Sequence, residues 1–411
     1  PFPCFGRRRH VPRRRHVPRS PTEASKKAPE GVDLSTALQQ IEGRQTALRK
    51  LPQWARTDGL WFPPRLSMEQ CSSEQTALYK RSLVARLLQT PEDEVNAALR
   101  MTDLTGGFGV DFSYLAILFG QATYVERMAH LCDTATHNFE VLNLTQACVK
   151  NTDGTEYLQE MEAVDLLYID PARRDEHGRK TVCLSACEPD VTKLQTQLRK
   201  KSRYCVIKLS PILDIQQALQ ELQGVVEVHV ISVEGECKEL LLVMQTEATP
   251  SVPIVHCVNL SEKVVYEPFV FTSQEETQAI CPYADSPKTY LYEPNASILK
   301  AQAYRTLAAR MNLHKLHPNS HLYTSENFIK DFPGRSFCVE GYCNFSKKEL
   351  KSFLQDVPKA NLTVRNFPAQ VAELRKRLRL AEGGETYLFA TTLANEQHVL
   401  VRCKKATEAI K

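Results

Sequence analysis

The segment Asp103-Leu-Thr-Gly-Gly-Phe-Gly-Val-Asp111 decides how this sequence folds. A short run that begins at Met101 leads into it, and a longer run that begins at Phe112 follows it. The three glycines permit a tight turn and let a ligand approach the backbone closely. We therefore predict a strand, a ligand-binding turn and a helix, in this order.

Short apolar runs alternate with helical stretches on the C-terminal side of this turn. Such alternation is typical of a doubly wound, mainly parallel sheet, so the predicted fold class is α/β. Only a short turn around Gly235 separates the last two runs, which predicts an antiparallel hairpin at the end of the unit. The predicted strands are 101–104, 122–126, 147–151, 164–170, 204–210, 225–233 and 238–245.

The acids around the turn indicate what it binds. The turn holds Asp103 and Asp111 but no cation, which suits pyrophosphate poorly, and a GxGxxG motif read from Gly107 would place Phe112 at its third glycine. Acids also follow the next two strands, where Glu126 can bind ribose hydroxyls and Asp153 an adenine amine. This set fits a ligand with a cationic amine and a sulfonium, such as S-adenosylmethionine. The predicted cofactor-binding residues are Asp103, Thr105, Gly106, Gly107, Gly109, Asp111, Glu126, Asp153 and Asp170.

The fourth predicted strand ends in Ile-Asp170-Pro171-Ala-Arg173-Arg174. Ligands of open α/β sheets bind at the carboxyl ends of the strands, so Asp170 is expected to face the cofactor. Its carboxylate can accept a proton or a hydrogen bond from a nucleophilic NH or OH. Pro171 would hold this bend, and the two arginines would clamp a substrate phosphate. A surface ion-pair loop is the alternative for the arginines.

A second arrangement uses lysine. Ribose 2′-O-methyltransferases carry a Lys-Asp-Lys-Glu set in which a lysine of lowered pKa activates the hydroxyl. Lys80, Asp170, Lys208 and Glu239 occur here in that order, so Lys208 joins Asp170 as a candidate catalytic residue. Salt bridges at the surface would give the same pattern.

Composition narrows the class of protein to which this chain belongs. Thirteen cysteines occur without a CxxC pair, which predicts reduced thiols in a cytoplasmic protein and no metal centre. No run of 18 apolar residues is present, so we expect no membrane span.

Charge is distributed unevenly along the chain. Residues 1–30 hold nine Arg or Lys and two Glu, and residues 335–411 hold fourteen Arg or Lys and eight Asp or Glu. Basic ends on an acidic middle suggest that the chain binds a polyanion.

The pattern changes along the chain predict five segments. They are a disordered basic N-terminus (1–30), a helical region (31–95), the α/β core (96–248), a small domain (249–333) and a last α+β unit (334–411). A helix is expected to run from Pro294 to about Met311. Another helix is expected at 368–379, and it carries Arg375, Lys376, Arg377 and Arg379. These cations would contact the phosphates of a nucleic acid; the alternative is an ordinary solvated face.

Several motifs resemble those of bacterial class I methyltransferases that carry a THUMP-like C-terminal domain. They are 66–80 (LSMEQCSSEQTALYK), 103–111 (DLTGGFGVD), 168–175 (YIDPARRD), 208–211 (KLSP), 293–301 (EPNASILKA), 365–368 (RNFP) and 383–392 (GGETYLFATT).

The resemblance implies a Rossmann-like core, a ferredoxin-like domain near 270–318 and a THUMP-like module near 335–405. It implies cofactor roles for Asp103, Gly106, Gly107, Gly109, Glu126 and Asp153, with Asp170 at the catalytic strand end. Related N-methyltransferases have an aromatic residue after Asp-Pro-Pro, where this chain has Ala172-Arg173.

The predicted function is methyl transfer from S-adenosylmethionine to a base nitrogen of RNA, either tRNA or rRNA. The alternatives are ribose 2′-O-methylation through the lysine set and a non-catalytic RNA-binding adaptor that keeps the fold. The predicted partner is RNA, and the oligomeric state stays open.

Overall fold

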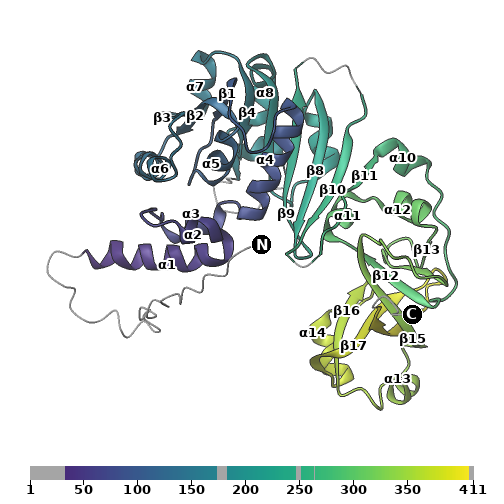
Figure 1. Cartoon of the computed structure of the whole chain (residues 1–411). Coiled ribbons are helices and arrows are strands. Elements are labelled where there is room, and N and C mark those ends of the chain that lie inside the picture. Colours follow the sequence, from purple (N-terminus) through teal and green to yellow (C-terminus); the bar gives the residue numbers. More distant parts are fainter. Residues whose placement is uncertain (1–32, 174–182, 247–250, 263, 407–411) are drawn as a thin grey trace, which may run out of the picture.

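The computed structural model describes residues 33–173, 183–246, 251–262 and 264–406. Figure 1 shows three parts, a group of helices at the N-terminal side, a large α/β core and a smaller C-terminal module. The predicted disorder of 1–30 and the predicted role of Arg174 lie outside the described residues. No helix among the described residues is long and apolar enough to cross a membrane.

The core is a nine-stranded sheet in the order β11-β10-β8-β9-β7-β4-β1-β2-β3. Five strands form a continuous parallel part of this sheet: β1 (Asn96–Asp103), β2 (Phe119–Glu126), β3 (Ala147–Asn151), β4 (Val164–Ile169) and β7 (Ser202–Leu209). The hairpin predicted around Gly235 joins β8 (Val225–Val233) to β9 (Glu236–Gln245), and β9 also runs antiparallel to β7. The α/β class and the closing hairpin are therefore confirmed.

Two further strands extend this sheet beyond the predicted end of the core at residue 248. β10 (Ile254–Leu260) pairs in parallel with β8, and β11 (Phe269–Thr272) pairs antiparallel with β10. Their alternating apolar residues indicate strands, but only tertiary pairing decides which sheet they join. Val255, Cys257 and Phe271 are buried in the same apolar cluster as the core strands.

Helices cover both faces of the core sheet. One apolar cluster holds α5 (Val110–Ala116), α6 (Ala129–Val141) and the second half of α4 (Glu74–Leu88). The other holds α7 (Gly154–Glu160), α8 (Val191–Lys200) and α9 (Ile215–Glu221), together with α11 (Ala296–Ala301) and α12 (Tyr304–Met311). A two-stranded ribbon of β5 (Ala172–Arg173) and β6 (Cys187–Glu188) follows β4.

The N-terminal helices hold the glycine turn in place. α1 (Leu34–Lys50), α2 (Pro52–Arg56) and α3 (Arg65–Gln70) share an apolar cluster with Phe108 of the turn. The rings of Trp54 and Phe108 meet edge to face at 5.1 Å between centroids. The packing of these helices thus fixes the backbone of the turn as well as their own core.

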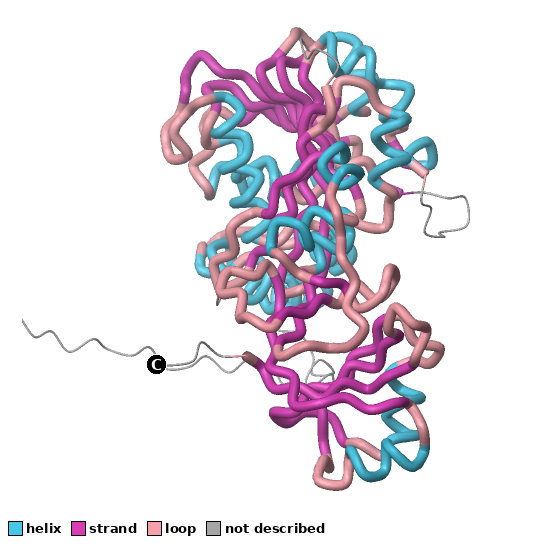
Figure 2. The backbone as a smooth tube through the Cα atoms, turned by 90° about the vertical axis from the view of Figure 1, so that its right-hand side faces the viewer, coloured by secondary structure: helices cyan, strands magenta, loops and turns pink. Residues whose placement is uncertain are grey.

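The C-terminal part forms one seven-stranded sheet, in the order β13-β14-β12-β15-β18-β17-β16. Figure 2 shows its strands below the core in one module. The strands are β12 (Tyr290–Pro294), β13 (His314–Lys315), β14 (Tyr323–Ser325), β15 (Gly334–Asn344), β16 (Lys359–Arg365), β17 (Ala381–Thr392) and β18 (His398–Lys405). The helices of this part are α13 (Lys347–Phe353) and α14 (Val371–Leu378), whereas α10 (Ser273–Gln278) directly follows β11 and contacts β11 and α12.

The single helix predicted from Pro294 to Met311 is wrong in one respect. It is divided into α11 and α12, because Gln302 adopts a left-handed conformation with φ of 60° and ends α11. The break lets both short helices pack on the core, where Ile298 and Leu307 are buried.

Candidate active site

The glycine turn lies between β1 and α5, at the carboxyl edge of the core sheet. Gly109 begins α5 with φ of 81°, a conformation that favours glycine. Gly106 has a different reason, since a Cβ there would lie 2.2 Å from the ring of Tyr124. The turn therefore needs glycine at Gly109 for its backbone angle and at Gly106 for close packing on β2.

Carboxylates support the turn from two sides. The Thr105 amide donates to Oδ1 of Asp103 at 2.9 Å, and the Gly107 amide donates to Oε2 of Glu126 at 2.9 Å. The other oxygen of Glu126 accepts from the Met128 amide at 2.9 Å. Each carboxylate oxygen has two lone pairs, so both acids retain acceptor capacity for a ligand.

Asp103 is almost fully buried. Burial, together with the nearby charges of Asp111 and Asp170, raises the pKa of Asp103 to about 8, although bonds from Thr105 oppose the rise. A buried acid of this kind gains most when a cation arrives, because the cation restores its ionised form.

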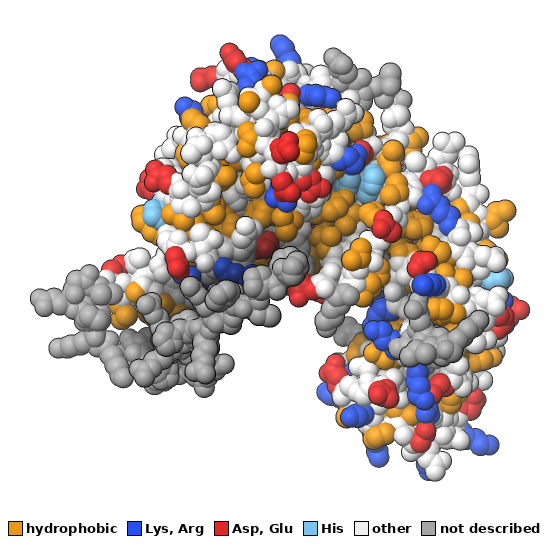
Figure 3. Space-filling view, viewed as in Figure 1, with side chains coloured by type: hydrophobic (Ala, Val, Ile, Leu, Met, Phe, Trp, Pro, Cys, Tyr) orange, Lys and Arg blue, Asp and Glu red, His pale blue; other side chains and the backbone are white. Residues whose placement is uncertain are grey.

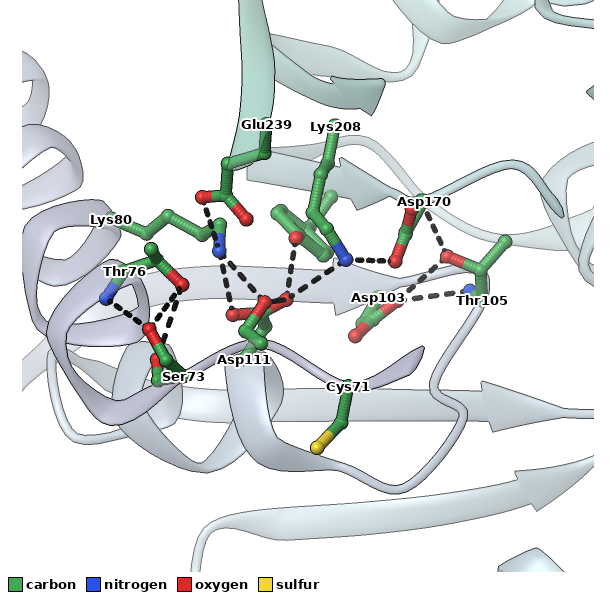
Figure 4. A network of polar contacts seen from close by, with 12 residues as sticks. Cys71, Ser73, Thr76, Lys80, Asp103, Thr105, Asp111, Asp170, Lys208 and Glu239 are labelled. Atoms are coloured by element: carbon green, nitrogen blue, oxygen red, sulfur yellow. Dashed lines mark hydrogen bonds and ion pairs between the residues drawn. The ribbon is translucent and has the colours of Figure 1, made fainter. Parts of the chain in front are cut away.

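Asp111 lies at the centre of a buried network (Figure 4). Its carboxylate accepts from Ser72 at 2.7 Å and from the Tyr168 hydroxyl at 2.8 Å, and Nζ of Lys80 lies 3.0 Å away. Burial pushes the pKa of Asp111 up, but the charges of Lys80 and Lys208 outweigh it and bring this pKa to about 2. The carboxylate of Asp111 thus binds side chains of its own protein, and its role in cofactor binding stays a prediction.

Two lysines complete the network. Lys80, on α4, lies 2.7 Å from Oε1 of Glu239 on β9. Lys208, at the end of β7, donates to Asp170 at the end of β4, and lies 3.8 Å from Asp111. The four residues of the predicted lysine set therefore meet in one cluster, with Asp111 between the two lysines.

The protonation of Lys208 differs from what the ribose hypothesis requires. Burial alone would lower the pKa of Lys208, but the charges of Asp170, Asp111 and Glu239 raise it above its usual value. Lys208 is therefore a cation that orients Asp170. Asp170 is also held through its backbone, whose amide donates to Oγ1 of Thr105 at 2.7 Å.

A crystal structure of a protein from Porphyromonas gingivalis W83, described as a methyltransferase, is 38% identical to this chain, with 95% of each chain covered and a TM-score of 0.83. Family models match a ferredoxin-like domain at residues 290–333 and a THUMP domain-like unit at 334–405. The chain belongs to this family of class I S-adenosylmethionine-dependent methyltransferases.

More distant structures match parts of this methyltransferase. A SAM-dependent methyltransferase from Agrobacterium tumefaciens is 16% identical over 41% of this chain and 62% of its own, with a TM-score of 0.32. The human methyltransferase 10 domain containing protein is 16% identical over 50% of this chain and 98% of its own, with a TM-score of 0.38. No curated protein sequence matched the chain.

The acid-rich turn of the methyltransferase fits its cofactor chemically. Among the described residues no cation pairs with the buried Asp103, which suits the cationic amine, and Glu126 ends β2 with acceptor capacity for ribose hydroxyls. Asp153 caps α7 by accepting from the Thr155 amide at 2.8 Å. The three acids follow three neighbouring strands, as the sequence predicts.

The predicted substrate-binding residues lie in two places. Pro171 is buried directly after β4, and the Arg173 backbone pairs with Cys187 in the β5–β6 ribbon. Arg375 donates to the Ala360 carbonyl at 3.2 Å, so one of its N–H groups is already hydrogen-bonded within the THUMP-like unit. Lys376, Arg377 and Arg379 are exposed at the end of α14.

Sequence reasoning missed Ser72 and Tyr168, which hold Asp111. Tyr168 lies in β4 two residues before Asp170, which follows the strand, so its nearness to Asp170 in the sequence could have revealed it. Ser72 gives no such signal, because the loop before α4 reaches Asp111 only through tertiary packing.

Proposed function

We propose that this methyltransferase methylates a base nitrogen of RNA, in tRNA or rRNA, with Asp170 orienting the acceptor. The observation that carries the proposal is the position of the Asp170 carboxylate. It lies at the carboxyl end of β4 beside the glycine turn, and its side chain is 37% exposed, against 10% for Asp111 and 5% for Glu239. Asp170 is therefore the acid of this network that an incoming substrate meets.

Different residues of the chain would bind the cofactor and orient the methyl acceptor. Bound S-adenosylmethionine supplies an electrophilic methyl group on its sulfonium. Asp103 would pair with the cofactor amine, and Glu126 would accept hydrogen bonds from its ribose. Asp170 would accept a hydrogen bond from the acceptor N–H, orient the nitrogen lone pair for the in-line approach that methyl transfer requires, and take the proton that the nitrogen loses. Lys208 fixes the direction of the Asp170 carboxylate.

Ribose 2′-O-methylation is the second candidate, because Lys80, Asp170, Lys208 and Glu239 do lie together. It needs a lysine that can accept the hydroxyl proton. Carboxylates keep Lys208 protonated, and Lys80 is buried between Asp111 and Glu239. These contacts favour the base nitrogen over the ribose hydroxyl as the methyl acceptor.

The C-terminal module supports RNA as the substrate. Lys376, Arg377 and Arg379 are exposed at one end of α14, where cations can contact phosphates. Figure 3 shows a hollow between the N-terminal helices and the C-terminal module. Figure 1 places α14 at the edge of the C-terminal module that borders this hollow. An RNA bound along α14 would reach the carboxyl edge of the core sheet across the hollow.

Mass spectrometry of total RNA nucleosides tests the proposal directly. Cells that lack the protein are compared with cells complemented by wild type, Asp170→Asn or the exposed control Asp58→Asn. Loss of one base-methylated nucleoside, restored by wild type and Asp58→Asn but not by Asp170→Asn, is the expected result. Loss of a 2′-O-methylated nucleoside would establish the second candidate, and an unchanged nucleoside profile would reject RNA as the substrate.

A further inference from the structure

A group of possible metal ligands lies away from the active-site network, on the α4 side of the sheet. Glu227 and His229 are two residues apart on β8, so their side chains share one face. His256 on β10 is the register partner of His229. Residues i and i+2 of one strand point to the same face of a sheet. A third residue, directly across on the neighbouring strand, brings its side chain to the same place above that face.

The distances at this point suit a small cation. One ligand atom from each residue lies within 4.8 Å of the other two. Nε2 of His229 is 2.9 Å and Nε2 of His256 is 3.8 Å from the same carboxylate oxygen, Oε2 of Glu227. An ion bound about 2 Å from each ligand atom would fit among them after small side-chain movements.

Two observations distinguish this cluster from an ordinary buried hydrogen-bond network. Nε2 of His256 is buried and has no hydrogen-bond partner among the described residues. The other nitrogen of His229, Nδ1, lies 2.8 Å from the hydroxyl of Tyr79 on α4. Histidines that bind a metal through one nitrogen nearly always use the other in such a hydrogen bond.

The state of the two imidazoles agrees with this geometry. Their rings stack at 4.4 Å between centroids with an angle of 11° between planes, an arrangement that disfavours charge on both. Burial lowers the pKa of His229, and burial with the neighbouring His229 lowers the pKa of His256 to about 4. Neutral imidazole is the form that ligates metals.

We propose that Glu227, His229 and His256 bind one divalent transition-metal ion, with Zn²⁺ as the best match. Two imidazoles and a carboxylate are typical zinc ligands, and a water molecule would take the fourth position. A pocket of about 440 Å³ includes Arg86 and Glu227 in its lining, so it reaches the carboxylate of the cluster, while the two histidines lie outside its lining. Bound metal would tie β8, β10 and, through Tyr79, α4 together, one residue from Lys80.

Arg86 competes with the ion for the carboxylate of Glu227. Its guanidinium donates to both oxygens of Glu227, at 3.0 and 2.5 Å. The Arg86 side chain is half exposed, so it can leave Oε2 to the metal and keep its bond to Oε1. A carboxylate shared in this way remains oriented by an outer partner, as metal-ligating carboxylates usually are.

Metal titration of the purified full chain tests the proposal. The protein is stripped with a chelator, kept reduced, and titrated with Zn²⁺ against a competing chromophoric chelator, and in parallel with Co²⁺. We compare wild type with His256→Asn, which removes a ligand, and with Tyr79→Phe, which removes only the outer hydrogen bond. His130→Asn is the matched control, since His130 is exposed on α6.

We expect one tight Zn²⁺ site per chain and a Co²⁺ absorption spectrum with d–d bands but no thiolate-to-cobalt charge transfer. Tyr79→Phe should weaken Zn²⁺ binding by about 10–100-fold, His256→Asn by at least as much, and His130→Asn not at all. Zn²⁺ should also raise the Tm of wild type but not of His256→Asn.

Two results would overturn the site. One is the absence of stoichiometric metal binding by wild type. The other is metal binding at a different place, shown by an affinity that His256→Asn leaves unchanged or by a Co²⁺ spectrum dominated by thiolate ligands. Cofactor binding, measured on each variant, shows that the variant is folded and keeps this test independent of the methyl-transfer proposal.

Discussion

Lys208 and Asp170 form an ion pair across the ends of the neighbouring strands β7 and β4. Lys80 makes the matching connection from α4 to Glu239 on β9, and Asp111 lies between the two lysines. Alternating charges thus hold this edge of the sheet together, in addition to the apolar packing around Phe108. Such a network fixes the Asp170 carboxylate in one orientation, at the expense of burying several charged groups.

Replacing Asp170 by Asn should abolish most of the turnover. The amide cannot accept a proton and presents a donor to the acceptor N–H, so we expect kcat to fall by about 10²–10⁴-fold. Affinity for S-adenosylmethionine, measured by calorimetry, should change little because Asp103 and Glu126 remain. Asp58→Asn, at an exposed position, serves as the control. Turnover near the wild-type level in Asp170→Asn would remove Asp170 from the mechanism.

Lys208→Ala separates the two candidate reactions. If Lys208 only orients Asp170, its loss should lower kcat by about tenfold or less, and cofactor binding should persist. If a lysine were the base for a ribose hydroxyl, the loss should reach about 10²–10⁴-fold. Single-turnover kinetics with the RNA substrate decide between these values, and the identity of the methylated nucleoside provides a second, independent readout.

Cofactor binding should release a proton. The pKa of Asp103 is about 8 in the ligand-free protein, so roughly nine tenths of the molecules carry this proton at pH 7. Pairing with the cationic amine favours the ionised carboxylate, and the proton leaves. Calorimetry at pH 7 in buffers of different ionisation enthalpy should therefore show release of nearly one proton, diminishing as the pH rises above 8. Release of the same size in Asp103→Asn would contradict the assignment.

Lys80→Met tests the buried network. It leaves Asp111 and Glu239 buried with less compensation, and breaking a buried pair in this way typically costs about 3–5 kcal/mol. We expect a loss of this order in the free energy of unfolding, measured by urea denaturation. Lys238→Ala is the matched control, because Lys238 pairs with Glu236 at the surface, where a pair is worth about 1 kcal/mol or less. Equal losses would show that the Lys80 network contributes little.

The exposed cations of α14 should govern the salt dependence of RNA binding. The double variant Lys376→Gln/Arg379→Asn removes two charges, and asparagine tolerates the left-handed conformation of residue 379. The slope of log K against log salt should become shallower by about 0.7 per lost phosphate contact with single-stranded RNA. Lys150→Gln, exposed on β3, is the control. An unchanged slope in the double variant would exclude α14 from the RNA interface.

Local sequence patterns predicted most of the core. The strands around Asp103, Glu126 and Asp170 and the hairpin at Gly235 follow from apolar periodicity and turn residues, which act over a few positions. The break of the expected 294–311 helix at Gln302 was not predictable in this way. Gln302 has no local requirement for a left-handed conformation, and the packing of Ile298 and Leu307 against the core decides it.

The sequence by itself determined the glycine turn, the order of strands along the chain and the acids at their ends, because each is encoded by neighbouring residues. Only the tertiary structure decided the partners of those acids. It placed Asp111 between two lysines from distant elements, and it brought His256 beside His229 by adding β10 to the sheet. Such contacts join residues far apart in the chain, and their energy depends on burial and exact register, neither of which a local pattern contains.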